Sequence, residues 1–408
     1  MKRTILIIAA LTLTLTLTLP ALAIDWPQWR GANRDGVNPE KNLLDEWPAD
    51  GPKLLWRSEG LGAGFSSVST SKGRLFTMGD GKESSHVYCL SVKDGSKIWT
   101  SRAIGKTGGN YKGTRSTPTV VGDLLYALGQ FGDLVCLKTA TGAEVWRTSL
   151  KTNYGGRPGG WNYTESPLVD GDKIIVTPGG KKGAVIALNR MTGKLIWKSA
   201  DFTDGAQYSS LIISEFGGER QYIQLTGQNV VGLAAGTGKV LWQAARKGRT
   251  ATVSTPIFHD GSLFVTSSYG VGCNGFKISY DGTRFSAKQT YANKTIANHH
   301  GGCILVGNYI YGSSGSTLAC IDLKTGEEMW RERSAGKGAI VVADSKIILR
   351  AEKGTVALVA LSPKAYKEIS RFSQPDRTRA SAWSHPVVSD GVLYLKDQGL
   401  LLAYDLNK

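Results

Sequence analysis

Short runs of apolar residues, separated by glycine and aspartate, recur along almost the whole chain. Between residues 117 and 146, the runs Thr-Pro-Thr-Val-Val and Leu-Leu-Tyr-Ala-Leu are separated by a Gly-Asp pair at 122–123. A third run covers residues 134–138, and a fourth, at 143–148, follows the Thr-Gly pair at 141–142. Runs of this length between turn-forming residues predict β-strands, and no helical pattern of comparable length competes with them. The stretch therefore predicts four antiparallel strands.

This four-strand pattern repeats, and a tryptophan marks each repeat. Five segments each begin with a small residue. Five and six places after it stands a turn dipeptide that ends in glycine, and ten places after it stands a tryptophan. These tryptophans are Trp99, Trp146, Trp197, Trp242 and Trp330, at spacings of 47, 51, 45 and 88 residues, the last being two steps of 44. Periods of about 40–50 residues with four strands each are typical of β-propeller blades. Because a lone blade leaves both of its faces bare, we expect each tryptophan to pack against the neighbouring blade.

Eight such units fit into the chain, although two of them have lost the tryptophan. In the unit from 253 to 291, Phe285 stands near the expected place, and in the unit from 338 to 372 this place falls on Ile369 or Ser370. The sequence therefore predicts an all-β protein, an eight-bladed β-propeller of four-stranded antiparallel blades.

The last unit begins at residue 385 and stops at Lys408, before its outer strand. A segment near the front of the chain, Lys53–Arg57, has the pattern of the missing strand and carries a repeat-like tryptophan. We predict that this segment completes the last blade, because ring closure removes the sheet edges that an open array would expose. The predicted structural blade tryptophans are thus Trp56, Trp99, Trp146, Trp197, Trp242 and Trp330.

The first 23 residues have the features of a signal peptide. A basic start precedes an apolar stretch over residues 4–19, a proline and a small-x-small cleavage sequence at residues 21–23. An uncleaved membrane anchor is the alternative for this segment, and no later segment is long and apolar enough to span a bilayer. We expect an exported protein, periplasmic or extracellular. Its expected parts are a signal peptide over 1–23, an N-terminal extension over 24–51 and the propeller over 52–408.

The chain of 408 residues has a formal net charge of +16. Such an excess favours anionic partners, such as acidic glycans, polycarboxylate ligands or anionic lipid surfaces, and a solvated basic surface is the alternative explanation. Nucleic acid is not expected, because no long basic run occurs and the protein is predicted to be exported. We expect a monomer that binds a protein, a glycan or a small polar ligand.

Five cysteines are present, so at least one thiol of a monomer has no disulfide partner. Cys89, Cys136 and Cys320 fall at the same place in the repeat, which predicts buried strand positions. Cys273 and Cys303 lie outside this place and are the better candidates for a disulfide, although the sequence leaves their pairing open.

The repeat resembles a known family. Residues 320–330, Cys-Ile-Asp-Leu-Lys-Thr-Gly-Glu-Glu-Met-Trp, are similar to the tryptophan-docking motif of PQQ-like (pyrroloquinoline-quinone-like) propellers. Residues 25–31, Asp-Trp-Pro-Gln-Trp-Arg-Gly, resemble the start of small secreted quinoprotein-like members. The resemblance covers residues 52–408 and implies the propeller fold. The family includes scaffold propellers of the BamB type and quinoprotein alcohol dehydrogenases, and for the latter it implies PQQ and calcium as cofactors.

Two features depart from the dehydrogenase members of this family. Those enzymes commonly have two adjacent, bridged cysteines beside the quinone, whereas this sequence contains no Cys-Cys pair and no Cys-x-x-Cys-His sequence for a covalent haem. They are also typically much longer. The length is closer to that of the scaffold members, but the lipid-anchor cysteine of that type is missing.

In a propeller, the inner strands begin around one mouth of the central channel, where loops from every blade converge. Aligning the blades places Glu165 and Lys337 across this channel from each other, in a ring of mostly serine and glycine. Arg115 and Lys337 suit the carboxylates of a ligand, and Glu165 with Asn162 offers oxygens to Ca²⁺. In the alternative, Glu165 pairs with a nearby arginine and these residues only line a wet channel. The candidate ligand-binding residues are Arg115, Asn162, Tyr163, Glu165, His300, Lys337 and Trp383.

Two other features near this mouth are candidates for a site. His299 and His300 offer imidazoles to a metal ion, but adjacent residues of a strand point to opposite faces. The glycine-rich loop over residues 154–161 joins two blades, which predicts either a lid over the mouth or a plain surface connection.

These observations support two functions. The first is a secreted binding or scaffold propeller for a protein, glycan or small polar ligand at the channel mouth. The alternative is a PQQ- and calcium-dependent quinoprotein oxidoreductase acting on an alcohol or sugar, in which Trp161 and Trp383 are candidates for stacking. A polysaccharide-acting enzyme would need paired carboxylates, and the ring supplies one. The sequence assigns no catalytic residue and leaves open whether the chain is an enzyme.

Overall fold

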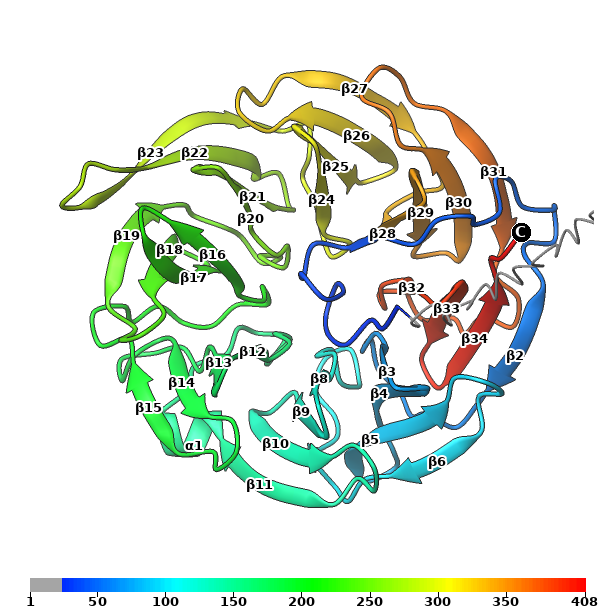
Figure 1. Cartoon of the computed structure of the whole chain (residues 1–408), viewed down its shortest axis with the longest axis horizontal. Coiled ribbons are helices and arrows are strands. Elements are labelled where there is room, and N and C mark those ends of the chain that lie inside the picture. The colour runs from blue at the N-terminus through cyan, green and yellow to red at the C-terminus, as the bar shows by residue number, and fades with distance from the viewer. Residues whose placement is uncertain (1–23) are drawn as a thin grey trace, which may run out of the picture.

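Eight four-stranded antiparallel sheets form a closed ring around a central channel (Figure 1). The structure is a computed structural model that describes residues 24–408. It confirms the predicted all-β, eight-bladed propeller. The predicted signal peptide over residues 1–23 lies outside the described residues.

Blades one to four follow one another in chain order, each running from an inner to an outer strand. Blade one contains β3 (Ser69–Ser71), β4 (Arg74–Asp80), β5 (Ser84–Ser91) and β6 (Lys97–Thr100), and β7 (Gly105–Lys106) also pairs with β5. Blade two contains β8 (Thr119–Val121), β9 (Leu124–Leu128), β10 (Asp133–Lys138) and β11 (Glu144–Ser149), which leads into the short helix α1 (Leu150–Tyr154). Blade three contains β12 (Leu168–Asp170), β13 (Lys173–Val176), β14 (Ile186–Asn189) and β15 (Leu195–Lys198). Blade four contains β16 (Ile212–Phe216), β17 (Glu219–Leu225), β18 (Asn229–Ala234) and β19 (Val240–Ala245).

Blades five to eight complete the circle. Blade five contains β20 (Ile257–His259), β21 (Ser262–Ser267), β22 (Gly272–Tyr280) and β23 (Phe285–Asn293). Blade six contains β24 (Cys303–Val306), β25 (Tyr309–Ser314), β26 (Thr317–Asp322) and β27 (Glu328–Arg333). Blade seven contains β28 (Gly338–Ala343), β29 (Lys346–Ala351), β30 (Thr355–Ala360) and β31 (Glu368–Ser373), with β1 (Val37–Asn38) added beside β28. Blade eight contains β32 (Val387–Ser389), β33 (Val392–Asp397), β34 (Leu400–Asp405) and, as its outer strand, β2 (Leu54–Ser58).

Strand β2 closes the ring as predicted. It pairs antiparallel with β34, so that Leu54 lies opposite Tyr404 and Ser58 opposite Leu401. The first and last parts of the propeller thereby share one sheet. The side chain of Trp56 packs in the same hydrophobic cluster as Tyr404.

The outer tryptophans dock most blades onto the next one. The indole Nε1 of Trp56, Trp99, Trp146, Trp197 and Trp330 donates to a backbone carbonyl of the following blade at 2.9–3.1 Å. In most of these pairs the ring also covers the glycine of the next turn. A Cβ built on Gly142 would lie 2.6 Å from the ring of Trp99, and φ of Gly142 is +71°, so both space and backbone conformation require glycine there. Trp242 differs, because its Nε1 donates to Gln221 of its own blade at 2.6 Å.

Blade five uses a tyrosine in the docking position, so the assignment of this place to Phe285 was wrong. Tyr291 lies opposite Gly275, as Trp146 lies opposite Cys136 in blade two. The Tyr291 hydroxyl donates to the carbonyl of Leu323 in blade six at 3.1 Å, and its ring covers Gly326. In blade seven, Ser370 occupies the docking position, and its hydroxyl accepts from the backbone N–H of Trp47.

The segment before β2 enters the centre of the ring, where it fills part of the channel (Figure 1). The Trp26 N–H donates to Thr70 of blade one at 2.8 Å, and the Pro27 carbonyl accepts from Val120 of blade two at 2.8 Å. Strand β1 then runs parallel to β28 of blade seven, with Val37 opposite Val342. We call residues 24–38 the channel plug.

Two buried arginines fix the channel plug to further blades. Arg34 donates to the carbonyls of Ser166 at 2.8 Å and Pro167 at 3.1 Å, both in the approach to blade three. Arg30 donates to the carbonyl of Cys303, the first residue of blade six. The plug therefore crosslinks blades that do not touch one another directly.

All five cysteines are buried thiols, including Cys273 and Cys303, so the structure does not contain the disulfide considered for that pair. Cys89, Cys136 and Cys320 lie on the third strands of their blades, as predicted. Within residues 24–408, no helix is long and apolar enough to cross a membrane.

Candidate functional site

The loops that connect successive blades meet at one end of the channel and form a pocket. Seven of these loops contribute, and the volume is about 590 Å³ when the open mouth is counted. The lining residues are Trp29, Phe65, Tyr111, Arg115, Trp161, Thr164, Tyr208, Val253, His299, His300, Trp383 and His385. We call this the mouth pocket. The predicted location of a site, where the inner strands begin, corresponds to this pocket.

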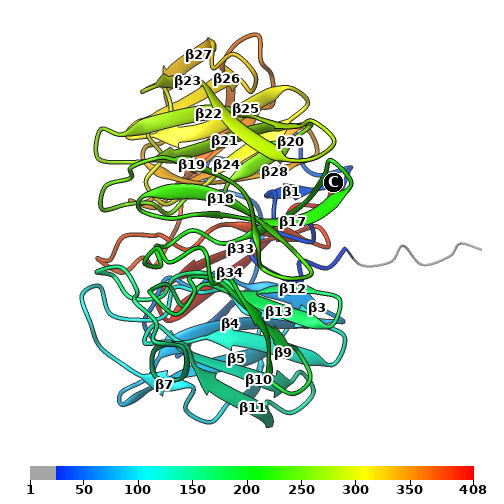
Figure 2. The ribbon, with the colours of Figure 1, turned by 90° about the vertical axis from the view of Figure 1, so that its left-hand side faces the viewer.

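The channel plug forms the floor of the mouth pocket. The Trp29 Nε1 donates to the hydroxyl of Thr255 at 3.1 Å, and the Trp29 ring lies 4.3 Å from the ring of His385. The loop that carries Tyr111 follows strand β7. Figure 2 shows β7 and strand β1 of the plug toward opposite faces of the ring. The pocket is therefore approached from the face opposite β1.

The walls of the pocket are aromatic. Trp161 stacks on Tyr208 with ring centroids 5.0 Å apart, and Phe65 contacts Trp383 at 4.7 Å. Tyr111 lies between the two walls, 5.1 Å from Trp383 and 6.1 Å from Trp161. Tyr111 has φ of +58° and is 54% exposed, so a bulky residue is held in a strained conformation over the pocket. Displacing this side chain would uncover both walls.

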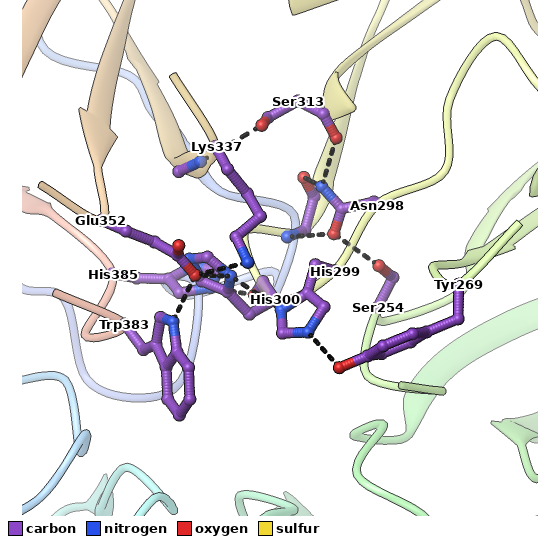
Figure 3. A network of polar contacts seen from close by, with 12 residues as sticks. Ser254, Tyr269, Asn298, His299, His300, Ser313, Lys337, Glu352, Trp383 and His385 are labelled. Carbon is purple, nitrogen blue, oxygen red and sulfur yellow. Dashed lines mark hydrogen bonds and ion pairs between the residues drawn. The ribbon is translucent and has the colours of Figure 1, made fainter. Parts of the chain in front are cut away.

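One side of the pocket is polar, and Glu352 is its centre (Figure 3). The Oε1 of Glu352 accepts from Lys337 Nζ at 2.8 Å and from Trp383 Nε1 at 2.5 Å. The Nδ1 of His300 lies 3.6 Å from the same oxygen, and the Nδ1 atoms of His299 and His300 are 3.3 Å apart. His299 Nε2 also lies 3.4 Å from the hydroxyl of Tyr269.

The loop between blades five and six holds both histidines in place. The Asn298 side chain accepts from Ser254 at 2.7 Å and donates to the Ser313 carbonyl at 2.9 Å. Burial lowers the pKa of His299 to about 4 and the pKa of His300 well below its ordinary value. Both imidazoles are therefore neutral at pH 7, and each ring presents a lone pair.

Arg115 supplies a positive charge on the other side of the pocket. Its guanidinium donates to Gln130 Oε1 at 3.1 Å and to the carbonyls of Asn110 and Tyr111, so it also supports the loop over the pocket. Gln130 in turn donates to Asp80 at 3.0 Å. Burial lowers the pKa of Arg115, and the charge of Asp80 opposes this shift.

Glu165, in contrast, lies inside the propeller. Its carboxylate accepts from the Thr177 N–H at 2.7 Å and from the Thr177 hydroxyl at 3.0 Å, with Gln224 Nε2 at 3.4 Å. Burial raises the pKa of Glu165 to about 8, although the Thr177 hydrogen bonds and the charge of Arg34 favour the ionised form. The charge of Arg34, in the channel plug, acts on Glu165, but among the described residues no arginine forms an ion pair with this buried carboxylate.

The structure brings together some of the predicted site residues and separates others. Arg115, His300 and Trp383 line the mouth pocket, and Lys337 joins them through Glu352. Tyr163 is buried in a hydrophobic cluster of blades two and three, where its hydroxyl donates to the Pro178 carbonyl at 2.9 Å. Asn162 is half-buried in a turn with φ of +63°.

Sequence reasoning missed several parts of this site. They include Glu352, Tyr269 and Trp29, together with the aromatic residues Phe65, Tyr111 and Tyr208. Glu352 and Tyr269 lie in the turns after the second strands of their blades, and those turns reach the same mouth as the loops between blades. Examining that position in every blade would have found both. The position of Trp29 depends on long-range contacts of the plug, for which the repeat pattern contains no signal.

The residues present do not fit a calcium site. Calcium takes six to eight oxygen ligands. In the mouth pocket, the groups around the Glu352 carboxylate are an imidazole, an ammonium and an indole, none of which offers an oxygen. The oxygens of Glu165 are occupied by Thr177, and the raised pKa leaves this carboxyl largely protonated at pH 7. These contacts do not support the calcium site expected at Glu165 and Asn162.

Eight blades, most of them docked by a tryptophan, and a pocket at one channel mouth define a propeller of the PQQ-like class. The chain belongs to the PQQ-like repeat family described as outer membrane protein assembly factor BamB, which matches residues 83–332. It is 28% identical over 151 residues to the BamB protein of Burkholderia pseudomallei. That match covers 37% of this chain and 34% of the relative, so the chain spans about a third of the length of this relative.

Solved structures agree on the fold. BamB from Moraxella catarrhalis superposes with a TM-score of 0.63 at 15% identity, covering 87% of this chain and 99% of that one. Quinohemoprotein alcohol dehydrogenase from Comamonas testosteroni superposes with a TM-score of 0.61 at 12% identity, covering 94% of this chain and 81% of that one. At these identities the similarity concerns the fold alone.

Proposed function

We propose that this chain is an exported binding propeller that holds a small, ring-shaped polar ligand in the mouth pocket. Once the exposed Tyr111 side chain moves aside, a flat ring would lie between the walls formed by Trp161 and Trp383. Polar ring edges would meet Arg115 and His299. The observation that carries this proposal is the set of six aromatic side chains, from the plug and five different loops, around one opening.

A binding experiment with two probes tests this proposal. Equilibrium dialysis with PQQ examines a planar, carboxylated ring, and calorimetry with a neutral oligosaccharide examines a stacked sugar ring. We expect one probe to bind saturably with one site per chain. Trp161→Ala should weaken this binding about tenfold, which corresponds to about 1.4 kcal/mol.

Tyr280→Ala is the matched control, because Tyr280 is an exposed aromatic residue of blade five outside the pocket. This control variant should bind like the unmodified chain. Failure of both probes to bind, or equal loss in the two variants, would contradict the proposal.

A PQQ-dependent oxidoreductase acting on an alcohol or sugar is the second candidate function. The aromatic walls and Arg115 suit a flat ring with carboxylates. The lack of a suitable oxygen set for calcium places this candidate second. Dye reduction by the protein with PQQ and an alcohol, measured with and without calcium, would favour it over simple binding.

Export and a protein partner are further parts of the proposal. The BamB relative is an outer membrane protein assembly factor, and we propose a protein partner for this chain on that ground. Export is proposed because residues 1–23 have the features of a signal peptide. Mass spectrometry of the secreted protein should find a mature chain that begins near Ile24, and retention of residues 1–23 would contradict cleavage.

A further inference from the structure

One group of three metal-binding side chains occurs among the described residues, and it lies in the polar side of the mouth pocket. It consists of His299, His300 and Glu352, whose ligand atoms all lie within 4.8 Å of one another. Two of them come from the loop before β24, and the third comes from the turn between β29 and β30. The three side chains point toward one another (Figure 3).

The spacing of these atoms matches a tetrahedral metal centre. Ligands at about 2.0–2.1 Å from a tetrahedral ion are separated from each other by about 3.3 Å. The two Nδ1 atoms of His299 and His300 are 3.3 Å apart, and His300 Nδ1 is 3.6 Å from Glu352 Oε1. Two of the three distances between ligand atoms therefore nearly match those of a tetrahedral site. The third distance, between His299 and Glu352, needs a small inward movement.

The adjacent histidines can converge because they do not belong to a strand. Residues 294–302 form the loop between β23 and β24, so the alternation of side chains in a strand does not apply to His299 and His300. The Asn298 contacts and the hydrogen bond between His385 Nε2 and the His300 carbonyl, at 2.8 Å, hold this loop. The ligand set is thus built into the framework of two blades.

We propose that His299, His300 and Glu352 bind one divalent transition metal ion of the zinc or copper type. Two imidazoles and one carboxylate are ligands that suit these ions and not calcium. Three protein ligands leave a fourth position for water or for a ligand atom, as in zinc sites that act on bound molecules. This inference does not depend on the identity of the organic ligand proposed above.

Lys337 gives the site a built-in competitor. Its ammonium group lies 2.8 Å from the Glu352 oxygen that would bind the metal, and its side chain is 34% exposed. A metal ion bound to this oxygen would lie close to the ammonium, and the two positive charges would repel each other. Metal binding therefore requires Lys337 to swing toward solvent. Removal of this charge should therefore tighten metal binding.

The test is calorimetric titration of the tag-free protein with Zn²⁺, together with paramagnetic resonance of the Cu²⁺ complex. We expect one metal ion per chain and copper hyperfine structure from two nitrogen ligands. Glu352→Gln and His299→Gln should each weaken zinc binding at least about 10- to 100-fold, and Lys337→Met should strengthen it. Titration with Ca²⁺ should give no comparable binding.

His259→Gln is the matched control, because this exposed histidine of β20 lies outside the pocket. Melting curves establish that each variant is folded. The proposal is overturned if zinc binds the His299→Gln and His259→Gln variants with equal affinity, if Lys337→Met weakens binding, or if Ca²⁺ binds more tightly than Zn²⁺. Because the readout is the metal itself, failure here is distinguishable from failure of PQQ or oligosaccharide to bind.

Discussion

Glu165 and Lys396 are ionisable side chains in the interior of the ring, where burial disfavours the charged form of each group and so shifts the two pKa values in opposite directions. Burial raises the pKa of Glu165 to about 8 and lowers the pKa of Lys396 to about 7. The Nζ of Lys396 is buried without a hydrogen-bond partner. Both groups thus couple the stability of the propeller to pH, although neither lines the mouth pocket.

Replacing Glu165 with glutamine should remove one pH dependence. The folded chain retains the Glu165 proton up to about pH 8, whereas an unfolded glutamate loses it near the ordinary pKa of 4.5. The unmodified protein therefore loses stability as the pH rises from about 4.5 to 8. In melting experiments, Glu165→Gln should gain stability relative to the unmodified chain across this window, and a constant difference between pH 5 and 9 would contradict the buried carboxyl.

Replacing Lys396 with methionine should stabilise the fold, most strongly at low pH. The unfolded lysine retains its proton up to the ordinary pKa of 10.5, whereas the folded one loses it near 7. The stability of the unmodified chain therefore rises with pH between about 7 and 10.5. Below pH 7 the buried, protonated Lys396 destabilises the folded chain most. Denaturant unfolding should show the largest gain of Lys396→Met at pH 6, and a loss of stability there would mean that the ammonium is satisfied.

At the scale of strands and loops, blade five shows where the repeat pattern fails. Tyr291 follows its partner position Gly275 by 16 residues, whereas Trp146 follows Cys136 by 10. The β22–β23 hairpin is longer than the others, so counting ten places leads to Phe285 instead. The sequence contained the docking residue, but its place became visible only through the register of the strands.

Tyr291 should be as important to its blade interface as the tryptophans are to theirs. Tyr291→Ala removes a ring that covers Gly326 of the next blade and should cost about 3–5 kcal/mol of unfolding free energy. Tyr291→Phe is the control, since it removes only the hydrogen bond to Leu323 and should cost about 0.5–1.5 kcal/mol. Similar losses in both variants, measured by denaturant unfolding, would show that the ring itself does not dock the blades.

At the scale of the whole molecule, the ring and its closure follow from the sequence, and the channel plug does not. The repeat period predicts eight blades because each blade depends on local strand patterns, and the incomplete last blade indicates where the front of the chain must pair. The plug is held by contacts of Arg30 and Arg34 with distant blades, which leave no periodic pattern. The mouth location could be predicted for the same reason as the ring, but the Glu352 cluster depends on turns between strands.

Ring closure can be tested at Trp56. Trp56→Ala should cost about 3–5 kcal/mol, because it opens the contact between blade eight and blade one. Leu55→Ala changes the exposed neighbour on the same strand, and its effect should stay within about 0.5 kcal/mol. Deleting residues 52–60 should lower the melting temperature by many degrees. An unchanged melting curve of the deletion variant would be incompatible with the closed ring.

We propose that the loops between blades and the channel plug together form the ligand site. Hydrogen–deuterium exchange of the full mature chain, measured with and without saturating PQQ, locates bound ligand most directly. We predict slower exchange in residues 107–115 and 297–302 and around Trp383, with unchanged exchange in the outer strands. Protection confined to the outer strands, or no protection at the mouth while PQQ is bound, would contradict this account.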